Sequence, residues 1–257
     1  MRPRVCILRT DGTNCDEETA YAFEQAGGRP ELTHINQLRC RTCRLQSYEI
    51  LAIPGGFSYG DAIASGKILA VELVSYLGEE IGEFINQQKL VIGICNGFQV
   101  LMRTGLLPFC TLGRMQATLT ANDSGHFECR WISMMAEPSP CVFTRNIEEP
   151  MQLQVAHGEG KFFTDNETLQ KIEAEGLVAL RYADESDRQT QCYPANPNGS
   201  LNGIAGVCDP TGRIFGLMPH PERFVRPLQH PNWRRNAIAQ PHGLAIFRNA
   251  VEFAKDM

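Results

Sequence analysis

Residues Val91-Ile-Gly-Ile-Cys-Asn-Gly97 decide how this chain folds, because the periodicity of the sequence changes there. Leu90 to Ile94 is a short apolar run rich in β-branched residues, which predicts a buried strand. From Asn96 onward apolar residues recur at helical spacing, so a helix is expected to follow directly. Cys95 stands at the junction, with a glycine two residues before it and another two residues after it.

The pattern Gly-x-Cys-x-Gly is that of a nucleophile elbow with Cys in place of Ser. A sharp strand-to-helix turn exposes the nucleophile, and side chains in place of Gly93 or Gly97 would collide within the turn. The N-terminus of the helix favours a thiolate through its dipole and its free N–H groups. The pentapeptide alone is equally compatible with a small apolar cysteine buried at a strand end.

The composition describes an ordinary soluble globular protein. The chain has 257 residues, of which 43% are hydrophobic and 21% charged, and its formal net charge is −5. This charge gives no electrostatic signature of nucleic-acid binding, and no apolar run is long enough to span a membrane. The N-terminus lacks a signal-peptide core, so we expect a cytoplasmic protein with neither a nucleic-acid nor a membrane partner. Because Met1 lies just before the first predicted strand, a free-standing chain is expected.

Ten cysteines are many, but a chain of this length does not need a disulfide scaffold. We predict that they are reduced. Cys40-Arg-Thr-Cys43 is the one CxxC motif, and no second ligand pair follows at zinc-site spacing. Two surface or half-buried thiols on a helix are favoured there over a redox dithiol, and no metal is expected.

The first half of the chain alternates strands with helices, which predicts a mostly parallel open sheet with helices on both faces. The second half has strands joined by polar loops, which predicts an antiparallel extension of a mixed α/β sheet. We expect a single domain over residues 1–257. The predicted strands are Arg4–Leu8, Glu31–Ile35, Glu49–Ile53, Leu90–Ile94, Arg114–Thr120, Phe127–Met134, Met151–Ala156, Leu177–Tyr182, Ile204–Cys208 and Arg213–Leu217. The predicted helices are Asp16–Ala26, Ile63–Gln88 (broken near Gly78), the elbow helix, Leu169–Glu175 and Pro241–Lys255.

A nucleophilic cysteine needs a base, and His220 is the best candidate among six histidines. It follows a predicted strand at the sheet edge where sites form in open parallel sheets, and Cys95 ends its own strand at that edge. Pro221 favours an extended backbone at His220, so Glu222 points the same way and can orient the imidazole. Taken singly, a turn histidine and a solvated glutamate are ordinary features; together with the elbow they predict a Cys–His–Glu triad.

Acyl transfer also needs donors for an oxyanion. Gly55 and Gly56 follow the third predicted strand at the same edge, where backbone N–H groups can approach a carbonyl oxygen closely. The N–H of Asn96, directly after the nucleophile, is the second expected donor. The alternative is an ordinary Gly-Gly turn.

Three of these stretches, Pro54-Gly-Gly56, Gly93-Ile-Cys-Asn-Gly-Phe-Gln99 and His220-Pro-Glu222, resemble the class I glutamine amidotransferases, the triad glutaminase family. That resemblance implies a flavodoxin-like sheet. Further stretches, spread over nearly the whole chain, resemble the ammonia-donating glutaminase subunits of purine biosynthesis. They are Arg9–Asp16, Gly55–Asp61, Asn122–Trp131, His157–Phe162, Pro197–Ser200 and Gly216–Arg223. The segment Val225 to Gln240 is longer than in compact members of the family.

The resemblance implies glutamine as substrate, bound with its side-chain amide over Cys95. The thiolate attacks, His220 protonates the departing ammonia, and water hydrolyses the γ-glutamyl thioester. Gln99 is expected to help hold glutamine. His157, Gly158 and Glu159 are expected to line its α-amino and α-carboxylate end, partly through their backbone.

The chain has no P-loop signature, so no cofactor is expected in it. The resemblance implies that ATP and Mg²⁺ bind to a separate large synthetase subunit, which receives the ammonia, and that a small bridging subunit also takes part.

Three alternatives remain open at this stage: an amidotransferase for another acceptor, another elbow-cysteine hydrolase such as a peptidase or γ-glutamyl hydrolase, and a docking subunit with an incidental triad. Asn96 after the nucleophile disfavours the peptidases, which typically place His there. The stretch Arg223 to Arg235 holds four arginines and Trp233, but the acidic total charge favours a protein-docking or solvated loop over a nucleic-acid site.

Overall fold

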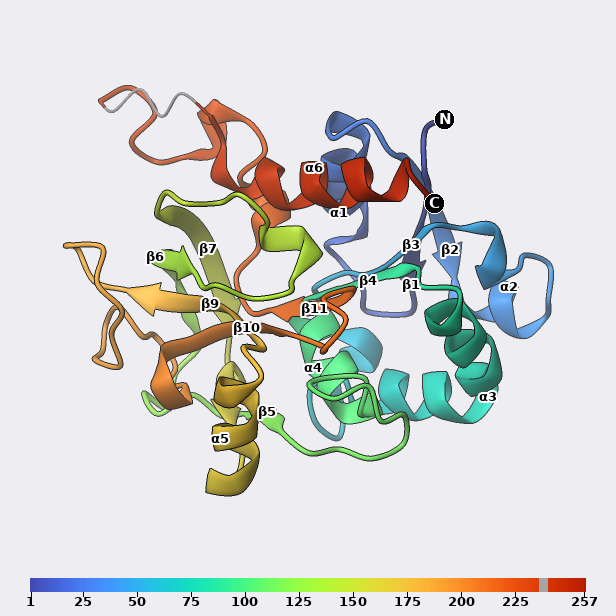
Figure 1. The fold of residues 1–257 in the computed structure, drawn as a ribbon, viewed down its shortest axis with the longest axis horizontal. Coiled ribbons are helices and arrows are strands. Elements are labelled where there is room, and N and C mark those ends of the chain that lie inside the picture. The colour runs from blue at the N-terminus through green and yellow to red at the C-terminus, as the bar shows by residue number, and fades with distance from the viewer. Residues whose placement is uncertain (236–239) are drawn as a thin grey trace.

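A computed structural model describes residues 1–235 and 240–257 of the chain, and its framework is one large twisted sheet (Figure 1). Nine strands form this sheet in the described residues, in the order β2-β1-β3-β4-β11-β10-β9-β6-β7. The strands are β1 Arg4–Arg9, β2 Arg29–His34, β3 Ile50–Ile53, β4 Leu90–Ile94, β5 Thr118–Thr120, β6 Glu128–Ala136, β7 Met151–His157, β8 Lys161–Phe163, β9 Val178–Ala183, β10 Ile204–Cys208 and β11 Ile214–Leu217. The helices are α1 Asp16–Gln25, α2 Ile35–Arg39, α3 Lys67–Asn86, α4 Asn96–Thr104, α5 Asn166–Ala174 and α6 His242–Ala254.

The sheet has a parallel half and an antiparallel half, as the sequence predicts. Strands β2, β1, β3, β4 and β11 run parallel, and β10, β9, β6 and β7 continue the sheet with antiparallel pairings. Strands β3, β4 and β11 are buried along their full length, which explains their continuous apolar runs. The predicted fold class, a mixed and mostly parallel open sheet with an antiparallel extension, is confirmed.

The helices cover both faces of the sheet. Figure 1 shows α1 and α6 together on one side and α3, α4 and α5 on the other. Phe23 of α1 and Phe247 of α6 pack edge to face, with ring centroids 4.9 Å apart. Helix α4 packs directly on β4 and β11, so the elbow helix lies in the centre of the molecule. None of the described helices combines the length and apolar character that crossing a bilayer requires.

Several predicted element bounds are wrong, mostly because local hydrogen bonds compete with regular structure. Helix α3 starts at Lys67 instead of Ile63, since Gly66 before it has φ 71°, and it runs through Gly78 without a break. Only Thr118–Thr120 of the predicted strand Arg114–Thr120 forms a strand. In the remainder, the Thr111 hydroxyl lies within hydrogen-bond distance of two acceptors, the carbonyl oxygen of Arg114 and the side-chain oxygen of Gln116. Helix α2 and strand β8, which pairs with β5, were not predicted.

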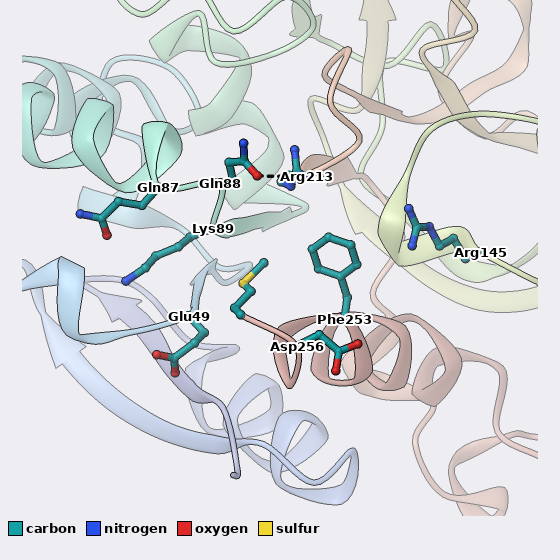
Figure 2. Close-up of a pocket in the computed structure, with 9 residues that line it drawn as sticks. Glu49, Gln87, Gln88, Lys89, Arg145, Arg213, Phe253 and Asp256 are labelled. Atoms are coloured by element: carbon teal, nitrogen blue, oxygen red, sulfur yellow. Dashed lines mark hydrogen bonds between the residues drawn. The ribbon is translucent and has the colours of Figure 1, made fainter.

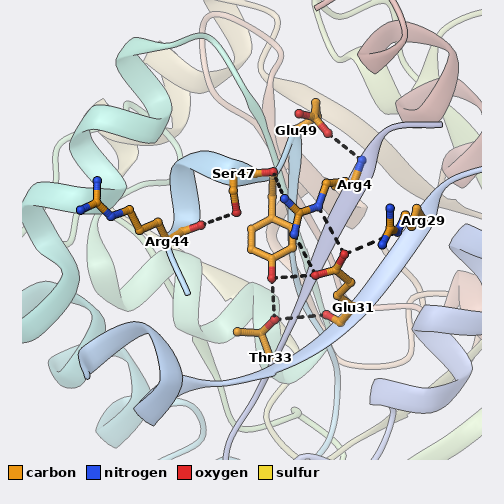
Figure 3. Close-up of polar contacts among 8 residues, drawn as sticks. Arg4, Arg29, Glu31, Thr33, Arg44, Ser47 and Glu49 are labelled. Atoms are coloured by element: carbon orange, nitrogen blue, oxygen red, sulfur yellow. Dashed lines mark hydrogen bonds and ion pairs between the residues drawn. The ribbon is translucent and has the colours of Figure 1, made fainter. Parts of the chain in front are cut away.

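The amino ends of β1 and β2 are joined by a polar cluster rather than an apolar one (Figure 3). The guanidinium of Arg4 pairs with the carboxylate of Glu31 at 3.0 Å, and the Tyr48 hydroxyl donates to the same carboxylate at 3.1 Å. The Arg4 backbone N–H donates to Glu49, directly before β3, at 2.6 Å. These bonds fix the relative positions of three neighbouring strands at the edge opposite to Cys95.

Candidate active site

The elbow at Cys95 has the geometry that its two glycines predict. Cys95 follows β4 and caps α4 with φ 50° and ψ −103°, a conformation that costs a non-glycine residue about 1–3 kcal/mol. A Cβ at Gly97 would lie 1.9 Å from the carbonyl oxygen of Ile53, and one at Gly93 would lie 2.5 Å from that of Gly97. Both positions therefore require glycine, because the turn packs backbone against backbone.

Adjacent strands bring His220 to the elbow. Leu217 of β11 is the register partner of Ile94 in β4, and its carbonyl accepts the Cys95 N–H at 2.8 Å. The backbone N–H of His220 is held by the carbonyl of Gln154 on β7, also at 2.8 Å. Thus a histidine 125 residues after the cysteine lies at the same edge of the sheet.

The Glu222 carboxylate orients the imidazole of His220. Its Oε1 lies 2.6 Å from Nδ1 of His220, and each residue is 1% exposed. Burial alone would lower the pKa of His220, but the Glu222 carboxylate and the sulfurs of Cys95 and Cys15 together raise it well above its usual value. The other ring nitrogen, Nε2, has no hydrogen-bond partner among the described residues. The pair therefore has a free nitrogen available for proton transfer.

The predicted oxyanion loop lies beside this pair. A Cβ at Gly55 would meet Cε1 of His220 at 2.8 Å, so only glycine fits against the ring. Gly56 has φ 135°, and its loop is fixed because Phe57 donates its N–H to the carbonyl of Gly12 at 3.0 Å. The N–H of Asn96 is the first of α4 and has no partner within the helix. The structure thus brings Gly55, Gly56 and Asn96 to the edge of the sheet that holds Cys95.

The side chain of Asn96 organises the loop after β3. Its Oδ1 accepts the N–H of Ser58 at 3.3 Å, and its Nδ2 donates to Asp61 at 3.1 Å and to Gln99 at 3.0 Å. Asp61 also accepts the N–H of Gly66 at 3.2 Å. Asn96 therefore bonds the segment from Ser58 to Gly66, which follows Gly55 and Gly56, to the elbow helix.

Both the oxygen and the nitrogen of the Gln99 side-chain amide form hydrogen bonds. Besides the bond from Asn96, its Nε2 donates to the carbonyl of Glu159 at 2.6 Å, and the side chain is buried. The Glu159 carboxylate lies 3.8 Å from Arg103 on the same helix. Gln99 therefore connects the elbow helix to the segment His157–Glu159.

His157 is turned inward, whereas Gly158 and Glu159 remain accessible. Its Nδ1 lies 3.1 Å from Oδ1 of Asn122, and its Nε2 faces the amide nitrogen of Asn198 at 3.5 Å. Burial, together with the positive charge of His220, lowers the pKa of His157 to about 4. The ring is thus neutral at pH 7 and packs inside the loop against Gly160, whereas Gly158 is exposed and Glu159 is half-buried.

Cys15 is a site neighbour that the sequence did not single out. It is buried, its N–H donates to the carbonyl of Gly55 at 3.3 Å, and Arg223 donates to its Sγ at 3.3 Å. Its sulfur and ligand atoms of His220 and Glu222 all lie within 4.8 Å of one another. Thiolate, imidazole and carboxylate are zinc donors, but the Arg223 cation on the sulfur opposes a second cation there. The sequence contained one indication that Cys15 lies near the site, namely its position in the stretch Arg9–Asp16, which resembles the family.

Other predicted features lie outside the site. Cys40 is exposed and Cys43 is half-buried, as predicted, but both follow α2 instead of lying on a helix, and that part of the prediction was wrong. All ten cysteines are free. In the stretch Val225 to Gln240, Arg226 lies over the ring of Tyr21 at 4.2 Å, and His230 Nε2 lies 2.9 Å from Gln152 Oε1. Residues 236–239 of that stretch lie outside the described residues. Its described part is held against the domain through specific side chains.

Comparison with known proteins identifies the class. The model of the CobB/CobQ-like glutamine amidotransferase domain matches residues 2–254, so the chain belongs to that family of glutamine amidotransferases. A glutamine amidotransferase from Thermotoga maritima has the same fold, with a TM-score of 0.56 at 15% identity.

Within that family the chain is similar to the PurQ subunits of phosphoribosylformylglycinamidine synthase. The PurQ subunit from Dehalococcoides mccartyi is 48% identical over 256 residues, which cover 99% of this chain and 98% of the relative. The one from Methanococcus maripaludis is 41% identical, with 98% and 97% covered. A chain in the structure of PurLQS from Thermotoga maritima superposes with a TM-score of 0.75 at 31% identity, over 98% of this chain and 99% of the other.

Proposed function

We propose that this chain is the glutaminase subunit of phosphoribosylformylglycinamidine synthase. It hydrolyses glutamine and passes ammonia to a synthetase that makes phosphoribosylformylglycinamidine from formylglycinamide ribonucleotide with ATP. One observation carries the proposal: a strained elbow cysteine, Cys95, stands at the same sheet edge as the buried pair of His220 and Glu222.

The first half of the reaction releases ammonia. The Cys95 thiol gives its proton to Nε2 of His220, its sulfur attacks the side-chain amide carbon of glutamine, and the carbonyl oxygen becomes an oxyanion. The N–H groups of Gly56 and Asn96 stabilise that charge, with Gly55 leaving room for the imidazole. His220 then gives its proton to the departing amine, and the Glu222 carboxylate stabilises the imidazolium.

The second half regenerates the thiol. His220, now neutral, accepts a proton from water, and the hydroxide attacks the γ-glutamyl thioester. The carbon–sulfur bond breaks, glutamate leaves, and the proton returns to the sulfur. The raised pKa of His220 suits the first half, because the imidazolium is the form that donates a proton.

Glutamine is held by the segment His157–Glu159. Gly158 and Glu159 contact the α-amino and α-carboxylate end, partly through their backbone, since they are the accessible members of the segment. His157 contributes by shaping the segment from the inside, and Gln99 contributes by fixing the Glu159 backbone at 2.6 Å.

The acceptor chemistry belongs to a partner. The sequence has no P-loop, so a large synthetase subunit binds ATP, Mg²⁺ and the ribonucleotide, and this chain needs no cofactor or metal of its own. A small bridging subunit completes the assembly. The chain works as a single domain in the cytoplasm, and neither nucleic acid nor a membrane takes part.

The test is a reconstituted assay with synthetase, ATP and ribonucleotide, supplied with either glutamine or an ammonium salt. Cys95→Ala abolishes glutamine-dependent product formation and leaves ammonium-dependent formation intact, because only ammonia generation needs the thiol. Cys141→Ala is the matched control, a buried cysteine away from the elbow, and it keeps both activities. Loss of both activities in a Cys95→Ala complex that still assembles would contradict the ammonia-donor role. Retained glutamine-dependent activity would contradict the nucleophile.

A further inference from the structure

A second pocket lies at the opposite end of the same strands that carry the candidate active site. Glu49, Lys89 and Arg213 directly precede β3, β4 and β11, and they line a cavity of about 540 Å³ (Figure 2). Arg145 and Phe253 complete its wall. Pockets of about 300–1,000 Å³ are typical of small organic ligands, so the space exceeds the needs of a single ion.

Two arginines in this pocket are positioned against one aromatic ring without a counter-ion. The guanidinium carbons of Arg145 and Arg213 lie 5.2 and 5.7 Å from the ring centroid of Phe253. Neither arginine forms an ion pair with a described carboxylate, and the buried Nε of Arg213 has no acceptor there. Two like charges held together on one ring repel each other, and a bound anion would relieve that repulsion and accept hydrogen bonds from the guanidinium groups.

The other charged side chains of the pocket lie apart from the two arginines. Lys89 does not compete for an anion, because its ammonium is engaged by the carbonyls of Gln46 and Tyr48. Figure 2 shows the two guanidiniums above and beside Phe253, whereas the carboxylates of Glu49 and Asp256 lie below it. Carboxylates accept hydrogen bonds from hydroxyl or amino groups. The pocket therefore offers an anion-binding wall and a hydroxyl-binding wall.

We propose that this cavity binds a phosphate monoester of a small hydroxylated molecule, such as a sugar phosphate or a nucleoside monophosphate. The phosphate lies between Arg145 and Arg213, and hydroxyl groups of the organic part face Glu49 and Asp256. The site is separate from the glutamine site, since the six residue steps from Lys89 along β4 to Cys95 span about 20 Å at about 3.3 Å per residue.

The experiment is calorimetric titration of the chain with inorganic phosphate, ribose 5-phosphate and adenosine 5′-monophosphate. The two esters bind saturably and more tightly than inorganic phosphate, and high salt weakens all three. Arg145→Gln and Arg213→Gln each raise the dissociation constant of the esters at least tenfold. Arg145 is exposed, so its variant keeps the test valid if Arg213→Gln folds poorly.

Arg188→Gln is the matched control. It removes the same charge from a side chain that is 76% exposed and paired with Asp184, so it leaves the dissociation constants unchanged. No saturable binding, or equal weakening in Arg188→Gln, would overturn the site. Equal affinity for inorganic phosphate and the two esters would overturn the assignment to an organic phosphate.

Discussion

The two ends of the central parallel strands differ in how their polar groups are satisfied. At the carboxyl end, Nε2 of His220 and Oε2 of Glu222 are buried without a hydrogen-bond partner in the described residues, and Cys95 has a strained backbone. At the amino end, Arg4 and Glu31 are partly exposed and joined to each other in a network of hydrogen bonds (Figure 3).

The difference distinguishes the strand ends that hold the candidate active site from the strand ends that do not. An unpartnered buried polar atom and a strained φ each destabilise the folded state, and they persist only where the surrounding core over-determines them. That core is present, because β3, β4 and β11 are fully buried. Local rules of sequence are therefore broken where Cys95, His220 and Glu222 lie and obeyed in the cluster of Arg4 and Glu31, which is the pattern expected if the former is an active site.

After Cys95→Ala, the largest effect is expected from Glu222→Gln. Glutamine hydrolysis falls about 10²- to 10⁴-fold, less than in Cys95→Ala, because the base loses its orienting carboxylate while the nucleophile remains. Burial already opposes the charged imidazole, and without that carboxylate the largest contribution that raises the pKa of His220 is lost, so its limb of the pH–rate profile moves to lower pH than in the wild type. Steady-state kinetics across pH measures both changes.

Glu222→Gln also changes how the free energy of unfolding depends on pH. A raised folded pKa means that the pair stabilises the wild type fully below the unfolded value of about 6.5, and that this stability is lost as pH rises through the raised value. Glu222→Gln lacks that dependence. Glu252→Gln, at a side chain 76% exposed, is the control and keeps wild-type kinetics. An unchanged rate in Glu222→Gln would mean that another acid orients His220.

The sequence predicted the parts of the site that depend on local chain geometry. The elbow at Cys95 follows from a change of period and two glycines. The contact between His220 and Glu222 was also predicted, but from an extended segment, whereas Pro221–Arg223 form a 3-10 turn that follows the extended His220. The antiparallel extension follows from strands joined by loops. These features need no knowledge of distant contacts, because a few neighbouring residues determine them.

The parts it missed depend on contacts between distant segments. The short strand β8 exists because β5 pairs with it, and Cys15 joins the site because a loop after β1 meets the loop after β3. The prediction that Gln99 helps to hold glutamine did not include the contacts of its amide with Asn96 and with the carbonyl of Glu159. No local sequence pattern predicts such pairings, since both partners look like ordinary loop or helix residues.

A smaller effect, on stability, is expected from the neutral histidine behind the site. The pKa of His157 is about 4 in the folded protein and about 6.5 in the unfolded chain, so the unfolded state takes up a proton first as pH falls. Wild-type stability therefore contains a contribution of about 3 kcal/mol that is present above pH 6.5 and is lost between about pH 6.5 and 4. Denaturant unfolding at several pH values measures it.

The comparison needs variants that differ only in the titrating group. His157→Gln is less stable at pH 7 but loses less further stability on acidification than the wild type does. His126→Gln, at an exposed position, follows the wild-type curve. Parallel curves for His157→Gln and the wild type would show that His157 is not held neutral by burial, and would weaken the contrast between the two ends of the strands.

The smallest effect is expected at the opposite edge, where Glu31→Gln removes the carboxylate that Arg4 and Tyr48 share. The Glu31 side chain is 31% exposed and that of Arg4 is 38% exposed, so solvent screens their attraction. The interaction with Arg4 lowers the pKa of Glu31, and its contribution is present above the unfolded pKa and is lost as pH falls through the lowered value. We expect a loss of less than about 1 kcal/mol at pH 7, further reduced by salt, because exposed ion pairs contribute little even in good geometry.

Glutamine hydrolysis by Glu31→Gln stays at the wild-type rate, since the cluster lies at the amino ends of the strands. Glu79→Gln, on the exposed face of α3, controls for the change of net charge. A loss of several kcal/mol, or a fall in glutaminase rate, would show that this polar edge supports the active-site end instead of merely closing the sheet.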